Sequence, residues 1–377
     1  MAKLKDIFTL QMGKTPARAK GEYWNNGDNN WVSISDLSTF DKYVGNTRET
    51  ISDLAVKDSG IKPVPADTVI MSFKLTLGKT AITVKPTYTN EAIMAFVPNG
   101  KYPVFPSYFY HFFGGRDWSI GTNRAVMGIT LNKATLGEID VATPSIEEQI
   151  KIAEHLDKVD ELISYRKEQL TKLDELVKSR FVELFGDPKY NKSNLVKIGE
   201  IGALTSGGTP SRAKPEYFEG DIRWYSAGEL NSLYLPDSVE HISERALQQS
   251  SAKLFNKGTL MIGMYDTAAF KMGILTEDSS SNQACANLNP KQGYNIVWLY
   301  YLFDIMKPIF LQERQGVRQK NLSLSKIKEF EVPFAPFELQ ERFAAFVEQT
   351  DKSKLEIQKS LEKLETLKKA LMQKYFG

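Results

Sequence analysis

Two long segments of the chain, residues 145–185 and 338–376, contain no proline or glycine and are rich in Leu, Lys and Glu. This composition favours helix along the whole of each segment. Ser145 with Glu148 predicts a capping box at the start of the first helix, and Gly186-Asp187-Pro188 predicts its end. Residues 187–195 are mostly polar and are expected to form a linker.

Apolar residues recur along both segments with alternating spacings of four and three, which predicts a coiled-coil seam. The seam residues are Ile152, Leu156, Val159, Ile163, Leu170, Leu173 and Val177 in the first helix and Phe343, Val347, Ile357, Leu361, Leu364 and Leu371 in the second. Because length and register match, we expect the two helices to pack on each other. The alternative is that each helix packs on its own globular domain.

Four seam positions hold a cation instead of an apolar side chain, namely Arg166, Arg180, Lys354 and Lys368. Their aliphatic stems can cover the seam while the charge reaches water. Pairing with acids such as Glu168 and Glu362 is the other solution, and the pattern does not choose between them.

The chain is a duplicate of itself. Residues 13–23 (GKTPARAKGEY) recur as 207–217 (GGTPSRAKPEY), and further matches at a nearly constant separation join residues 27–37 to 220–230 and residues 149–160 to 340–351. A repeat of half the chain predicts two duplicated domains rather than a solenoid. The order globular region, helix, globular region, helix favours an antiparallel helix pair.

Each repeat opens with a region rich in glycine, proline and aromatic residues, with short β-type runs at 67–73 and 258–264. The fold class predicted is therefore α+β, with two duplicated globular domains joined by two long antiparallel coiled-coil helices. The expected boundaries are 1–143 for the first domain, 144–186 for the first helix, 187–195 for the linker, 196–335 for the second domain and 336–377 for the second helix.

Composition excludes several classes of protein. The chain has 377 residues, 42% of them apolar, and a formal net charge of only +2, so any attraction to nucleic acid must be local. Its single cysteine, Cys285, cannot form an internal disulfide, and its histidines are scattered. We expect no metal and no cofactor. The absence of a long apolar run or a signal-like N-terminus predicts a cytoplasmic protein that does not contact a membrane.

Four elements add to this duplicated plan: Gly-Thr-Pro-Ser-Arg at 208–212, Asn-Gln-Ala at 282–284, Gln-Lys-Asn-Leu-Ser at 319–323, and Pro144 before Glu-Glu-Gln at 147–149. Together they resemble the DNA specificity subunit of type I restriction-modification systems. The first repeat departs from this pattern, because Asn-Glu-Ala stands at 90–92 and no clear Gln-x-Asn-Leu-Ser is present.

The resemblance implies a non-catalytic subunit that binds double-stranded DNA. Two target recognition domains would each read one half of a bipartite, asymmetric site, and so direct type I adenine methylation and restriction to it. The helices, as central and C-terminal conserved regions, would set the spacer and dock two methyltransferase (modification) subunits. ATP-dependent restriction or translocase subunits are further candidate partners.

Two alternative functions belong to other classes of protein. Gly78-Lys79-Thr80 and Gly13-Lys14-Thr15 resemble the end of a phosphate-binding P-loop, although Phe73 and Phe8 replace its first glycine. A nucleotide-dependent enzyme using Gly78-Lys79-Thr80 is one alternative, and a purely structural coiled-coil protein is the other. The chain contains no hydrolase, zinc-protease or kinase motif and no adenine-methyltransferase segment, so no catalytic residue is predicted.

Candidate DNA contacts are cations, one amide and one tyrosine in predicted loops, where phosphates and base edges can be reached. The first repeat offers Lys14, Arg18, Lys20, Lys74, Lys79 and Arg124, and the second offers Arg212, Lys214, Tyr265, Lys271, Arg314, Arg318, Gln319 and Lys320. Residues 314–320 are the strongest local basic patch in the second half, since they include no acid. Because the two halves differ at 74–79 and 265–271, we expect two unlike half-sites.

Overall fold

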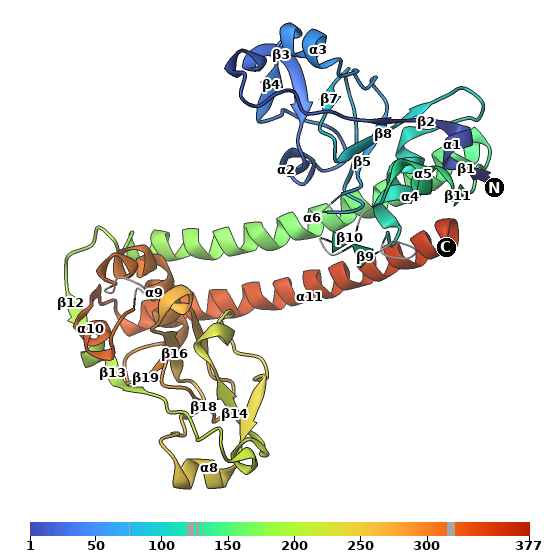
Figure 1. Ribbon diagram of the computed structural model, residues 1–377. Coiled ribbons are helices and arrows are strands. Elements are labelled where there is room, and N and C mark those ends of the chain that lie inside the picture. The colour runs from blue at the N-terminus through green and yellow to red at the C-terminus, as the bar shows by residue number, and fades with distance from the viewer. Residues whose placement is uncertain (75, 119–123, 126–127, 130, 315–320) are drawn as a thin grey trace. The chain divides into compact units, whose positions relative to one another are not determined.

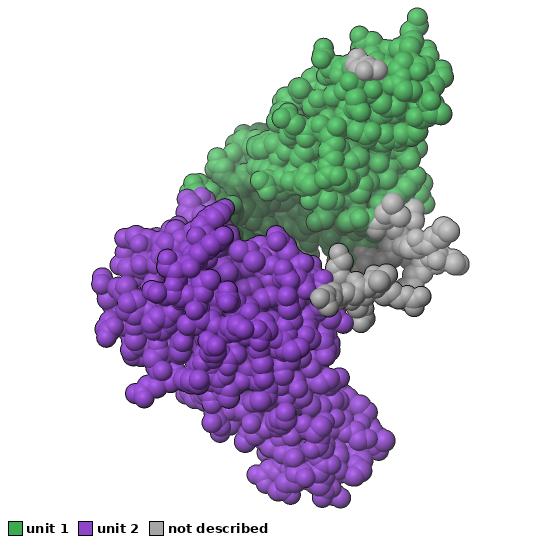
Figure 2. Space-filling view, turned by 90° about the vertical axis from the view of Figure 1, so that its left-hand side faces the viewer, with its two compact units in different colours: residues 1–167, 359–377 green, residues 168–358 purple. Residues whose placement is uncertain are grey.

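The computed structural model describes residues 1–377 except 75, 119–123, 126–127, 130 and 315–320, and at residues 26, 124–125 and 128–129 it describes the backbone alone. The chain divides into two compact units (Figure 2). Unit 1 comprises Met1–Lys167 and Lys359–Gly377, and unit 2 comprises Glu168–Gln358. Each unit therefore contains one globular region and a part of each long helix.

The globular region of unit 1 is built on a four-stranded antiparallel sheet, in the order β2-β8-β5-β6, and a three-stranded sheet, in the order β4-β3-β7. Short pairs β1-β11 and β9-β10 complete it. The strands are β1 Ala2–Lys3, β2 Phe8–Met12, β3 Trp24–Val32, β4 Glu49–Ile51, β5 Val69–Ser72, β6 Thr80–Ile82, β7 Tyr88–Thr89, β8 Ile93–Pro98, β9 Arg124–Ala125, β10 Gly128–Ile129 and β11 Asp140–Val141. The helices are α1 Leu4–Ile7, η1 Gly21–Tyr23, α2 Ile34–Leu37, α3 Asp53–Ser59, α4 Pro106–Gly115 and α5 Lys133–Gly137.

Unit 2 repeats this topology with sheets in the orders β13-β19-β16-β17 and β15-β14-β18, and a pair β12-β20. Its strands are β12 Leu195–Lys197, β13 Gly202–Ser206, β14 Ile222–Tyr225, β15 Glu240–Ile242, β16 Leu260–Gly263, β17 Met272–Ile274, β18 Ser280–Ser281, β19 Cys285–Pro290 and β20 Glu331–Pro333. Its helices are α7 Ile198–Ile201, η2 Pro215–Phe218, η3 Ala227–Glu229, α8 Glu244–Gln249, η4 Asp266–Ala268, α9 Ile296–Phe310, η5 Leu311–Glu313 and α10 Leu324–Glu329. The expected duplication and the α+β class are confirmed.

An aromatic helix covers the four-stranded sheet in each unit. In unit 1 the ring of Phe8 on β2 meets that of Phe109 on α4 edge to face, with centroids 4.8 Å apart. Phe96 on β8 stacks on Phe113 of α4 at 4.1 Å. Burial of such large rings is a main source of core stability, and α9 supplies the same apolar face in unit 2.

The two long helices are α6, Ile146–Phe185, and α11, Phe337–Phe376. Ser145 Oγ accepts the backbone N–H of Glu148 at 3.3 Å at the start of α6, and Gly186 with φ 73° follows its end. Positive φ costs glycine nothing, which suits it to this position. None of the described helices is long and apolar enough to cross a membrane.

Within each unit the two long helices run side by side in opposite directions (Figure 1). In unit 1, Lys368 Nζ contacts Asp160 Oδ1 at 2.6 Å and Arg166 Nε donates to Ser360 Oγ at 3.2 Å. In unit 2, the ring of Phe181 lies 5.3 Å from that of Phe343. As the residue number rises along α6, that of its partner on α11 falls, so the expected antiparallel pairing is confirmed.

The helices also pack on the globular regions near their ends. Ile152 and Leu156 belong to the core of unit 1, and Val177, Phe343 and Val347 belong to the core of unit 2. The two packing modes that the sequence left as alternatives therefore occur together. Every residue of the predicted seams is buried or half-buried, because the seam faces either the partner helix or a domain core.

The seam cations Lys354, Lys368 and Arg180 pair with acids. Lys354 Nζ contacts Asp174 Oδ1 at 2.6 Å, Lys368 contacts Asp160 as described, and Arg180 Nη1 contacts Glu183 Oε2 at 2.7 Å. Glu168, an expected partner, instead binds Lys172 within its own helix. The partners of Lys354 and Lys368 lie across the seam, where the antiparallel partner helix brings an aspartate close.

Candidate nucleic-acid interface

The arginine of the repeated loop is held within its own domain in both units. The guanidinium of Arg18 binds Glu49, with Nη2 3.1 Å from Oε2, and lies 3.8 Å from the ring centroid of Trp24. Arg212 binds Glu240 in the same way, with Nη2 2.7 Å from Oε2, and lies 4.2 Å from the ring of Phe218. The hydrogen bond from Arg212 lowers the pKa of Glu240.

The lysines of the same loop are also engaged. Lys20 Nζ lies 2.7 Å from the hydroxyl of Tyr23, and Lys214 Nζ lies 2.9 Å from that of Tyr217. Lys14 Nζ donates to the backbone carbonyl of Ser59. The two tyrosine rings are buried. The basic and aromatic residues thus hold each loop against its three-stranded sheet. This shared structural role explains why the same residues occur in both repeats.

Four other candidates, Lys74, Lys79, Tyr265 and Lys271, lie on two turns, one in each unit. We define the first turn as residues 73–79, between β5 and β6, and the second turn as residues 264–271, between β16 and β17. Lys74 is half-buried and Lys79 is exposed on the first turn, and Lys271 is half-buried on the second. Tyr265 on the second turn is 40% exposed.

A later segment of the chain is bonded to each turn. The backbone N–H of Leu131 donates to the carbonyl of Phe73 at 3.3 Å, and that of Leu322 donates to the carbonyl of Met264 at 2.8 Å. The second turn is therefore bonded to Leu322, two residues after segment 315–320. Arg314 precedes that segment and donates through Nε to the carbonyl of Leu311 at 3.0 Å.

Four candidates cannot be placed. Arg318, Gln319 and Lys320 lie outside the described residues, and for Arg124 only the backbone, in β9, is described.

The structure contradicts the phosphate-loop alternative. Thr80 begins strand β6, so Gly78 and Lys79 lie in a turn between two antiparallel strands. Gly13 follows β2 and leads into the loop that holds Arg18. A P-loop needs a helix directly after its lysine, because the helix N-terminus supplies donors to the phosphate. Among the described residues, no cluster of His, Cys, Asp or Glu could hold a metal ion.

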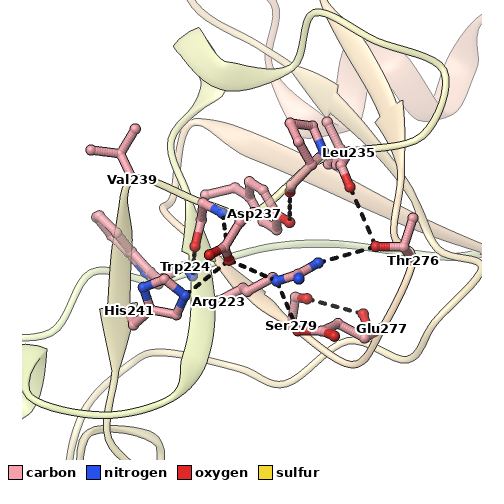
Figure 3. A network of polar contacts seen from close by, with 12 residues as sticks. Arg223, Trp224, Leu235, Asp237, Val239, His241, Thr276, Glu277 and Ser279 are labelled. Atoms are coloured by element: carbon pink, nitrogen blue, oxygen red, sulfur yellow. Dashed lines mark hydrogen bonds and ion pairs between the residues drawn. The ribbon is translucent and has the colours of Figure 1, made fainter. Parts of the chain in front are cut away.

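A polar network in unit 2 surrounds Arg223 on β14 (Figure 3). Its Nε lies 2.9 Å from Asp237 Oδ1 and 2.8 Å from Glu277 Oε1. His241 Nε2 approaches the same Asp237 oxygen at 3.0 Å. Burial would raise the pKa of Asp237, but His241 and Arg223 lower it overall. The network ties β14 to the segments on either side of it, and its residues do not belong to the second turn.

A different network ties the globular region of unit 1 to α6. Asp157 accepts from Lys42 Nζ at 2.6 Å and from Ser107 Oγ at 3.0 Å, and His111 Nε2 lies 2.8 Å from its other oxygen. His111 is only 3% exposed. Burial would raise the pKa of Asp157, but the hydrogen bonds to His111 and Lys42 lower it to about 2.

Sequence reasoning missed Asn321, whose Oδ1 accepts the backbone N–H of Asp266 at 3.0 Å. The residue stands inside the Gln-Lys-Asn-Leu-Ser element, but no local signal indicated that it reaches a turn 55 residues earlier. Glu49 and Glu240 were also missed. Their signal was available, because Glu-x-Ile-Ser occurs at 49–52 and again at 240–243.

Comparisons with known proteins agree with this architecture. Residues 1–175 and 190–369 match the family described as type I restriction modification DNA specificity domain. The specificity subunit of the type I restriction enzyme MjaIX from Methanocaldococcus jannaschii is 26% identical over 280 residues, which is 69% of this chain and 64% of that protein.

Two solved structures share the fold over the whole of this chain. The S subunit of the type I restriction-modification system of M. genitalium is 16% identical, with a TM-score of 0.57 and 95% of that chain covered. A chain from work on complex assembly and conformational transition of the type I system is also 16% identical, with a TM-score of 0.64 and 96% coverage. Because the family match covers nearly all of the sequence, the chain belongs to the type I restriction-modification DNA specificity family.

Proposed function

We propose that this chain is the non-catalytic subunit that recognises double-stranded DNA for a type I restriction-modification complex. Its globular regions, residues 1–143 and 196–335, each read one half of a bipartite, asymmetric site. The complex then methylates adenine at that site and directs restriction to it. The proposal also keeps the earlier boundaries for the helices, 144–186 and 336–377, and for the linker, 187–195.

The observation that carries this proposal is the contrast between a repeated scaffold and unlike turns. Arg18 and Arg212 make matching contacts in the two units, so we place them behind the contact surface. Lys74 and Tyr265 occupy the same place, directly after Phe73 and Met264, but differ in charge and shape. A symmetric scaffold with different exposed residues suits a site whose halves differ in sequence.

The helices are proposed to dock two methyltransferase subunits, one for each repeat. Leu176 on α6 and Leu367 on α11 are 48% and 46% exposed and occupy corresponding positions of the duplicated helices. Two exposed leucines at equivalent positions of the two repeats would suit the binding of two copies of one partner. ATP-dependent restriction subunits would join through the assembled complex.

The test is expression of the chain with its methyltransferase subunit, followed by native mass spectrometry and by mapping of methylated adenines on genomic DNA. We expect two methyltransferase copies per chain and a split motif whose halves differ. Robust methylation by the isolated chain would contradict the non-catalytic role. A purely structural coiled-coil protein would give a complex with no preference for any DNA sequence.

A further inference from the structure

The second turn has a well-fixed backbone. The N–H of Ala268 donates to the carbonyl of Tyr265 at 3.0 Å, and the N–H of Phe270 donates to that of Gly263 at 2.8 Å. Asp266 and Phe270 have φ angles of 47° and 52°, a region that residues other than glycine seldom adopt. A turn held in this way presents its side chains in one arrangement.

Asp266 is exposed on this turn beside Tyr265. Its backbone N–H is bound by the side-chain oxygen of Asn321 at 3.0 Å, and the next residue, Leu322, is bonded to Met264. The carboxylate therefore stands on a backbone that is supported from a second segment of the chain. Asn321 is a positioning residue, because its side chain binds the backbone of the turn.

A carboxylate on a turn that contacts DNA would weaken binding unless it makes a specific favourable contact. Phosphates repel a carboxylate, and cations supply the non-specific affinity of such surfaces. A carboxylate gains from DNA when it accepts a hydrogen bond from a base amino group, and the N4 amino group of cytosine in the major groove is its usual partner. The first turn has Lys74-Leu75 where the second has Tyr265-Asp266, so only the second carries an acid at this place.

We propose that Asp266 is a specificity-determining residue and accepts a hydrogen bond from the N4 amino group of a cytosine in the second half-site. Asn321 holds the backbone that aims it, and Tyr265 covers the contact from the adjacent position. This inference rests on the proposed function and adds the base that one residue recognises. It also assigns the recognised cytosine to the domain of unit 2 alone.

The experiment compares complexes of the methyltransferase subunit with the wild-type chain, Asp266→Asn and Glu219→Gln. Asparagine tolerates positive φ as aspartate does, so the turn keeps its shape. Glu219 is exposed in the same unit and outside the turn, so its amide variant removes one negative charge as a matched control. Asp266→Gly is a second variant, because glycine adopts this φ without strain.

Binding is measured on a panel of duplexes in which each base pair of both half-sites is replaced in turn. For the wild type and Glu219→Gln, replacing one C·G pair of the second half-site should weaken binding about tenfold or more. Asp266→Asn, whose amide oxygen can still accept, should weaken this discrimination, and Asp266→Gly should abolish it. Both variants should change the preference at that pair alone and keep every preference in the first half-site.

Two results would overturn the inference while leaving the proposed function intact. One is an unchanged preference at every position in both Asp266 variants. The other is a uniform gain in affinity that Glu219→Gln reproduces, which would mean that Asp266 only repels phosphates. If the wild-type complex recognises no split motif, the proposed function itself is wrong and this inference falls with it.

Discussion

Arg212 connects two parts of its domain through a single guanidinium, which binds Glu240 and lies over the ring of Phe218. Replacing Arg212 by Ala should lower the stability of unit 2 by about 1–2 kcal/mol, since an exposed ion pair and a cation-π contact are both lost. Unfolding in denaturant, followed by tryptophan fluorescence, measures this loss.

The same variant separates a scaffold residue from a phosphate contact. If Arg212 lies behind the DNA-contacting surface, the slope of log affinity against log salt should stay at the wild-type value. The matched variant Lys271→Ala, on the second turn, should reduce that slope by about 0.9 for one lost phosphate contact. A reduced slope in the Arg212 variant would return this residue to the DNA interface.

At the scale of elements, Asp157 joins α6 to α4 and to the loop of Lys42. Its pKa in the folded protein is about 2, below the usual aspartate value, because His111 and Lys42 stabilise the ionised form. A depressed folded pKa gives stability that is complete above pH about 4 and is lost as pH falls toward 2. We therefore expect Asp157 to contribute to the acid unfolding of unit 1 in this window.

Asp157→Asn tests this expectation. Near pH 7 it should destabilise unit 1 by about 1–3 kcal/mol, because His111 and Lys42 lose a charged acceptor. Below pH 4 the variant and the wild type should converge as the wild-type carboxyl takes up its proton. Glu154→Gln is the control, since Glu154 is exposed on the same helix. An undiminished difference between Asp157→Asn and the wild type at pH 2 would contradict this assignment.

Some elements and contacts could be predicted from the sequence and others could not. Helices α6 and α11 were predictable to within two residues at their starts and ends, because a heptad seam and, for α6, a capping serine are local signals. The pairing of Asp157 with His111 and Lys42 was not predictable, because it joins three segments that only the folded chain brings together.

In the candidate DNA interface too, some residues could be identified from the sequence, but their tertiary contacts could not. The sequence singled out Tyr265 and Lys271 by their difference from the first repeat, and the structure places both on one turn. It also singled out Arg18 and Arg212 as candidate DNA contacts. Their acids, Glu49 on β4 and Glu240 on β15, stand 31 and 28 residues away in sequence. The repeated Glu-x-Ile-Ser marks these acids, but only the folded chain shows that they pair with the arginines.

At the scale of the whole molecule, α6 and α11 each pass from one unit into the other, and each has 40 residues. If these helices set the spacer of the DNA site, lengthening both should lengthen the spacer. One heptad inserted after Leu170 and one after Leu361 keep both seams in phase and add about 10 Å to each helix.

The expected result is a methylation motif whose half-site sequences are unchanged and whose spacer grows by up to about three base pairs, at about 3.4 Å per pair. Affinity should fall as well, because three base pairs rotate the second half-site by about a third of a turn. The control is an insertion of five residues at the same two points, which turns each seam roughly to the opposite face of its helix and should prevent stable pairing of the helices. A folded, active heptad variant that methylates the original motif with its original spacing would mean that these helices do not determine the distance between the half-sites.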